Sequence, residues 1–157
     1  MTASEPETLR AVRTILAAIL VLGLLGILAE LLLLEHIEDV NQRIPIFLIL
    51  SALIVLLWHA AQRTPLTVRA LQVTMVAFVA AGALGVMLHY RGNVEFELEL
   101  HPGTTGGGLF FEALMGATPT LAPGAMVQLG LVGLAYTFRH PCLHDPLRTA
   151  PPSGRTT

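Results

Sequence analysis

Two ionisable residues, Glu30 and His89, are candidates for chemistry because they end two apolar segments of this 157-residue chain in the same way. Each follows a run of membrane-spanning length and a pair of glycines at the same spacing. Ionisable groups at membrane depth usually face the protein interior and find partners, so this intramembrane pair could form an ion pair, exchange a proton or bind a metal. In the alternative interpretation, each side chain reaches the outer headgroups on its own.

A larger set of carboxylates and imidazoles follows these two residues along the chain. Its members are Glu35, His36, Glu38, Asp39, Glu95, Glu97, Glu99 and His101. Carboxylates favour calcium or magnesium, whereas the histidines would favour zinc or another transition metal. A divalent cation could therefore bind here. No spacing in the set matches a known metal motif, so an acidic rim in contact with water is the alternative.

A third candidate is the stretch His140, Cys142 and His144 near the C-terminus. If the backbone were extended, the alternate spacing would align three ligands for an open zinc or copper site. The stretch leads into a Pro-rich tail, however, and ordering it would cost conformational entropy that only a metal or a partner could offset. We therefore regard it as a weak metal candidate.

Several other chemistries are disfavoured. The histidine pairs that could hold haem, His36 with His89 and His59 with His140, sit at helix ends and not inside a bundle. The glycine-rich stretch 101–108 lacks the lysine and the strand-to-helix context of a phosphate-binding loop. No serine lies with a base in an ordered outer segment, so hydrolysis has no support either. We expect no nucleotide or nucleic-acid partner, and a protein that is not an enzyme.

The elements that must position these residues are membrane helices. Hydrophobic residues make up 54% of the chain and charged residues 13%, which is more apolar surface than a water-soluble core of this size can hide. Four apolar stretches, each near the ~20 residues that cross a bilayer, carry the excess: 14–34, 44–61, 70–90 and 123–138. Pro45 and Pro65 mark the expected starts of the second and third helices. We predict an all-α integral membrane protein with four transmembrane helices.

The arginines orient these helices. Seven arginines fall on one side, and only Arg43 and Arg91 on the other. Because positive residues accumulate on the cytoplasmic side, both termini are expected in the cytoplasm of a bacterial-type inner membrane. The outer side is acidic and would attract cations or a basic partner.

An internal repeat is visible in the sequence. Residues 9–30 align without a gap on residues 68–89, at a constant offset of 59. The alignment superimposes two pairs of glycines that we expect to pack helices closely: Gly23, Gly26, Gly82 and Gly85. It predicts two duplicated helical hairpins. The alternative is coincidence, because glycine, alanine and leucine recur in many membrane helices.

The outer loop, residues 91–121, is enlarged. Apolar and charged residues alternate from Val94 to His101, which predicts a short strand. Residues 109–115 are expected to form a short amphipathic helix at the membrane surface. The expected domain organisation is a disordered cytoplasmic tail (1–8), a four-helix membrane domain (9–140) and a disordered Pro-rich tail (141–157).

The leading functional hypothesis is a non-enzymatic accessory or structural membrane subunit. Its acidic outer cap would bind a protein partner, a second copy of the chain or a cation. The alternative is an oligomeric transporter of small solutes or metal ions that uses Glu30 and His89. A membrane-bound metal or haem redox protein comes third.

Overall fold

The computed structural model describes residues 6–34 and 40–143. These residues form helices and turns, with no strand among them. In chain order the elements are α1 (Glu7–Leu33), α2 (Val40–Ala61), α3 (Pro65–Leu100), α4 (Gly106–Leu114), α5 (Gly124–Thr137) and the 3₁₀ turn η1 (Pro141–Leu143). The predicted all-α architecture is thus confirmed for the described part of the chain.

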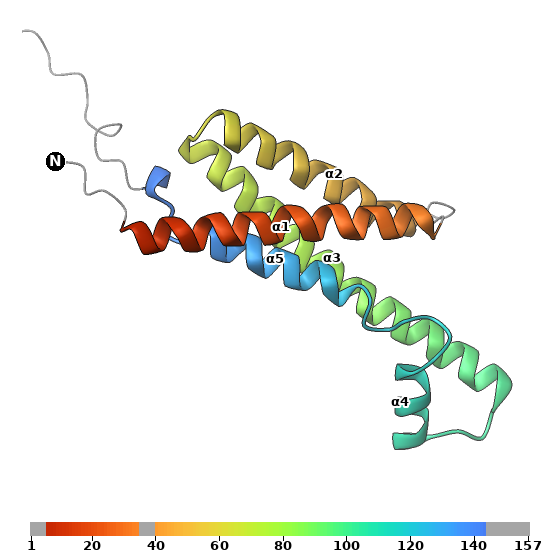
Figure 1. Ribbon diagram of the computed structural model, residues 1–157. Coiled ribbons are helices and arrows are strands. Elements are labelled where there is room, and N and C mark those ends of the chain that lie inside the picture. Colours follow the sequence, from red (N-terminus) through yellow and green to blue (C-terminus); the bar gives the residue numbers. More distant parts are fainter. Residues whose placement is uncertain (1–5, 35–39, 144–157) are drawn as a thin grey trace, which may run out of the picture.

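Three helices, α1, α2 and α3, are long and apolar enough to cross a membrane. The fourth apolar helix, α5, has 14 residues and a length of about 21 Å, which is less than the usual span. These four helices pack side by side, and α5 lies against α1 and α3 (Figure 1). Large apolar side chains such as Leu22, Phe47, Leu57 and Val73 are at least 70% exposed, as expected for helices surrounded by lipid.

The start of α3 agrees with the sequence prediction. Thr64 is the N-cap, its Oγ1 accepts a hydrogen bond from the Thr67 backbone N–H at 3.3 Å, and Pro65 occupies the first helical position. The Thr64 N–H in turn donates to Thr67 Oγ1 at 3.2 Å, which completes a reciprocal cap. The prediction for Pro45 is wrong, because α2 already begins at Val40. Pro45 removes one internal hydrogen bond near the helix start, and the helix continues through it.

The predicted strand at residues 94–101 is also wrong, because α3 continues as a helix to Leu100. Leucine and glutamate are good helix formers, and extending an existing helix costs less than nucleating a strand that has no neighbour. After α3 the chain turns into α4, which includes most of the predicted amphipathic segment. We call residues 91–123 the arm.

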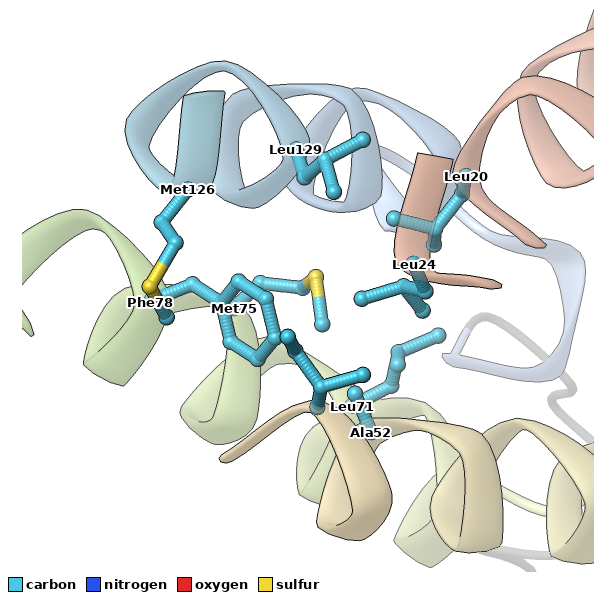
Figure 2. Close-up of a cluster of buried hydrophobic side chains, with 9 residues drawn as sticks. Leu20, Leu24, Ala52, Leu71, Met75, Phe78, Met126 and Leu129 are labelled. Carbon is cyan, nitrogen blue, oxygen red and sulfur yellow. The ribbon is translucent and has the colours of Figure 1, made fainter. Parts of the chain in front are cut away.

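The core of the bundle lies where α1, α2, α3 and α5 meet. Its buried side chains come from all four helices and point toward one another (Figure 2): Leu20, Leu24, Ile49, Ala52, Leu71, Met75, Phe78, Met126 and Leu129. Glycines let α5 approach α3 closely. A Cβ on Gly130 would lie 2.8 Å from the Met75 carbonyl oxygen, so no larger residue fits there without a shift of the backbone.

Three of the four glycines of the predicted packing face lie against the α5 segment. Gly23 faces the side chain of Leu129, and Gly82 and Gly85 face residues at the start of α5. Gly26 has open space around it. The close approach expected from the repeat therefore occurs at three positions, with α5 as the shared neighbour.

Candidate functional site

A buried asparagine fixes α4 and the turn after it to α3. Asn93 is 2% exposed. Its amide Nδ2 donates to three oxygens of the arm: Ala113 O at 2.9 Å, Thr118 O at 2.7 Å and Thr120 Oγ1 at 3.0 Å. Its Oδ1 accepts from the Thr118 backbone N–H at 3.1 Å. Gly116 provides the space for this side chain, since a Cβ there would lie 2.6 Å from Asn93 Cγ. One residue of α3 thus anchors both α4 and the turn that follows it.

The helix α3 is longer than a crossing of the bilayer core requires. Its 36 residues extend for about 54 Å, whereas the hydrocarbon layer is ~30 Å thick. Even with a tilt of about 20°, roughly 22 residues are enough to cross this layer. The last part of α3 and the helix α4 extend away from α1, α2 and α5 (Figure 1).

The projecting arm exposes apolar side chains beside carboxylates. The large apolar residues exposed on it are Phe96, Leu98, Leu100, Phe110, Phe111, Met115 and Leu121. Tyr90, Phe110 and Phe111 form a row of aromatic rings, with centroid separations of 5.9 and 5.5 Å. Glu95, Glu99 and Glu112 are exposed on the same arm. Exposed apolar surface of this kind usually marks an interaction site.

The predicted outer cation site is only partly described. Glu35, His36, Glu38 and Asp39 lie outside the described residues. On α3, Glu97 Oε1 and His101 Nδ1 are 2.8 Å apart. Glu95 and Glu99 are one helical turn apart, and Glu97 lies on a different face of the helix from these two. Among the described residues, no group of three or more histidine, cysteine, aspartate or glutamate side chains is arranged to hold a metal.

Within the described residues, Glu30 and His89 are joined by neither a hydrogen bond nor an ion pair. The Nδ1 of His89 lies 3.0 Å from the Pro119 carbonyl oxygen, which is consistent with an N–H donated to the arm. Glu30 is exposed and lines an open hollow that Pro119 and Thr120 also border. The two residues are therefore neighbours of the same turn and not direct partners.

The hollow beside Glu30 contains a second polar residue that the sequence pattern did not single out. Gln128, near the start of α5, is exposed and lines the same hollow. An amide and a carboxylate on the outer surface of apolar helices are costly in lipid unless water or a partner reaches them. The end of a helix gives such access, so the hollow belongs to the polar edge of the bundle.

A cluster of rings lies at the other end of the bundle, which we call the η1 end (Figure 1). His59 of α2 is 3% exposed, and His140, just after α5, is 7% exposed. Their ring centroids are 5.1 Å apart, and the ring of Tyr136 is 5.9 Å from His59 and 5.7 Å from His140. Two imidazoles that bind haem iron from opposite faces of the haem have ring centroids about 6 Å apart. The 5.1 Å separation of His59 and His140 is too short for this arrangement.

The predicted ligand stretch after α5 is not extended. The backbone N–H of Cys142 donates to His140 Nδ1 at 3.3 Å, and Pro141–Leu143 form the 3₁₀ turn η1. The alternate spacing of His140 and Cys142 therefore does not align these two side chains as expected. His144 lies outside the described residues.

Arg13 joins α1 to the end of α5. Its guanidinium donates to the carbonyl oxygens of Tyr136 (2.9 Å), Phe138 (3.2 Å) and Arg139 (3.0 Å). The last carbonyls of a helix lack the amide donors of a following turn, and a cation at a helix C-terminus also interacts favourably with the helix dipole. Arg13 thus fixes the backbone that carries Tyr136 and His140.

Sequence reasoning missed Asn93, Thr67 and Gln128 as site residues. Asn93 does carry a signal, because an amide after an apolar span has to find hydrogen-bond partners if it is buried. The partners could not have been found, since they lie 20 to 27 positions further along the chain. No protein-family model, curated protein or solved structure matches this chain.

Proposed function

We propose that this chain is a non-enzymatic membrane subunit whose arm binds a partner protein that presents basic and apolar side chains. The observation that carries the proposal is the arm itself, a helical projection fixed by Asn93 that exposes Phe110, Phe111 and Met115. These side chains would contact water if the arm had no partner, which is unfavourable.

The height of the arm favours a protein over the bilayer as its partner. Asn93 lies roughly 10 Å beyond the point where α3 should leave the hydrocarbon layer. Ala113, in the last turn of α4, is bonded at this level. The carboxylates of Glu95, Glu99 and Glu112 would also be repelled by anionic lipid headgroups, whereas a basic partner would be attracted to them.

The remaining features of the proposal concern topology. A bacterial-type inner membrane with both termini in the cytoplasm would place the arm outside, as the arginine distribution favours. Four crossings would require α5 to span a locally thinned bilayer. Two duplicated hairpins fit the arrangement, because α1 and α3 each pack against both α2 and α5.

Site-specific photo-cross-linking in intact cells tests the proposal. A photoreactive residue at Phe111 should give a discrete cross-linked product larger than the chain, and the charge reversals Glu95→Lys and Glu99→Lys should abolish it. The matched control is the same photoreactive residue at Leu22, which is 70% exposed on α1 and should contact lipid only. A product with the mass of two copies would show that the arm binds a second copy of the chain and not a different protein. The absence of any product would refute the proposal.

Membrane burial of the arm is tested separately. The chain has a single tryptophan, so Trp58→Phe combined with Phe111→Trp reports on α4 alone. Lipids brominated in their acyl chains should leave its fluorescence unquenched if the arm stands above the bilayer. Strong quenching would show that α4 lies in the membrane and would overturn the partner assignment.

An oligomeric transporter that uses Glu30 is the second candidate, because Glu30 and Gln128 line one open hollow. The centre of the bundle is filled by apolar side chains (Figure 2), so a polar path would have to run between copies. Proteoliposomes should then show cation flux that Glu30→Gln abolishes. Flux that is unchanged in Glu30→Gln would exclude this role for the residue.

A further inference from the structure

The imidazole of His59 has the arrangement of a metal ligand. Its Nδ1 lies 2.8 Å from Thr67 Oγ1. The hydroxyl of Thr67 has backbone carbonyl acceptors at Gln62 (3.0 Å) and Thr64 (2.9 Å), so its proton is directed to one of them. Thr67 Oγ1 therefore accepts from His59 Nδ1–H, and this tautomer leaves a lone pair on Nε2.

The His59 Nε2 atom is buried and has no hydrogen-bond partner among the described residues. Buried polar atoms are nearly always paired, so an unpaired one in a 97% buried side chain requires an explanation. Histidines that bind metals show this combination, with one ring N–H held by a neighbouring acceptor and the other nitrogen bare.

A second imidazole lies within reach. The ring of His140 has its centroid 5.1 Å from that of His59. If a ring nitrogen of each imidazole points to one ion at about 2 Å, this separation encloses a bent angle of roughly 110° and leaves a position open on the ion. We propose that His59 and His140 bind one Cu(I) ion per chain at the η1 end.

The ligand set favours this ion. Imidazole nitrogens suit zinc, copper, iron and nickel alike, so charge and the number of ligands decide between these ions. Two neutral imidazoles supply no negative charge to balance the charge of the ion. A monovalent ion costs less to desolvate than a divalent one, so it needs less balancing charge from its ligands. Copper in the lower oxidation state also accepts few ligands, whereas zinc sites in proteins have at least three.

Binding changes the end of the bundle in a defined way. His140 Nδ1 accepts the 3.3 Å hydrogen bond from the Cys142 amide, so its proton is on Nε2 in this tautomer. Ligation through Nε2 moves that proton to Nδ1 and breaks the bond to Cys142. The η1 turn should therefore rearrange when copper binds, and the backbone amide resonance of Cys142 should shift.

The test is an anaerobic competition for Cu(I) against a chromogenic chelator, with the purified full-length chain in detergent. One equivalent should bind, and His59→Gln and His140→Gln should each weaken binding at least tenfold. Thr67→Val should weaken it by about 10- to 100-fold, whereas Thr67→Ser keeps the acceptor and should restore it. His101→Gln, on the exposed arm, is the control and should change nothing.

X-ray absorption keeps the proposal falsifiable if a histidine variant fails to fold. The copper-loaded wild type should show two imidazole nitrogens at about 2 Å. Cys142→Ser should bind as the wild type does, and a loss of binding there would overturn the two-histidine assignment. Stoichiometric binding of zinc but not copper would overturn the choice of ion, and substoichiometric copper in the wild type would overturn the site.

Discussion

Replacing Asn93 by alanine should release α4 and the turn after it from α3 while the bundle stays folded. The Asn93 side chain takes part in four hydrogen bonds to the segment that contains α4 and the following turn. Asn93→Ala removes all four. The carbonyl of Ala113 keeps a bond from Thr120 Oγ1 at 3.2 Å, but the amide and carbonyl of Thr118 lose the partner that Asn93 supplied.

The size of the effect follows from these contacts. A protein hydrogen bond contributes about 0.5 to 1.5 kcal/mol net. The two hydrogens of Nδ2 are shared among three acceptors, so with the bond to Oδ1 the loss corresponds to three full bonds, or about 3 kcal/mol. Because 1.4 kcal/mol is a factor of ten, the equilibrium for local opening of α4 should rise by about a hundredfold. The hydrogen bonds of Asn93 go to α4 and the turn after it and not to α5, so the stability of the bundle should be nearly unchanged.

Amide hydrogen exchange in nanodiscs measures this opening directly. Protection of the α4 amides should fall by up to about a hundredfold. It should fall to the level of an unfolded segment if the wild-type protection of α4 is smaller than this factor. The control is Gly92→Ala, at the adjacent position with open space around it, which should stabilise α3 slightly. If α4 exchanges in Asn93→Ala as it does in the wild type, then other contacts hold the arm and the anchoring argument is refuted.

Three further predictions concern packing, capping and topology. Gly82→Leu should lower the temperature of unfolding in detergent, because a Cβ at this position would lie 2.8 Å from the α5 segment and overpacking costs about 1 to 3 kcal/mol. Gly26→Leu should have almost no effect, because Gly26 has open space around it. Arg13→Gln should increase hydrogen exchange at the end of α5, since the guanidinium bonds to three carbonyls there are lost. Reporter fusions after Gly103 and after Arg63 should fall on opposite sides of the membrane, and the same side for both would contradict the proposed crossing of α3.

The sequence predicted the helices well where local chemistry determines them. Thr64 and Pro65 define the start of α3 through a cap and a fixed φ angle, both of which depend on neighbouring residues only. The prediction failed at residues 94–101, where apolar and acidic residues alternate as in a strand. Periodicity was misleading there, because residues 6–34 and 40–143 contain no strand for this segment to pair with and the segment directly continues a helix.

The site residues were harder to predict because their partners are distant in sequence. Arg13 contacts the end of α5 across more than 120 positions, and His59 and His140 come together only because α2 and α5 end at the same side of the bundle. Gly23 and Gly82, which the repeat aligns with each other, both lie against α5. The alignment could not identify this shared neighbour.

The position of α5 links the two proposed sites. Its start leads directly from the arm, its end leads into His140, and Gly82 and Gly130 determine how closely it lies against α3. A displacement of α5 should therefore disturb both ends, while loss of the Asn93 anchor should disturb only the arm. Gly82→Leu is expected to weaken both Cu(I) binding and cross-linking at residue 111, and Asn93→Ala to weaken cross-linking alone. Equal loss of copper binding in both variants would show that the arm also stabilises the η1 end, contrary to this view of α5 as the connecting element.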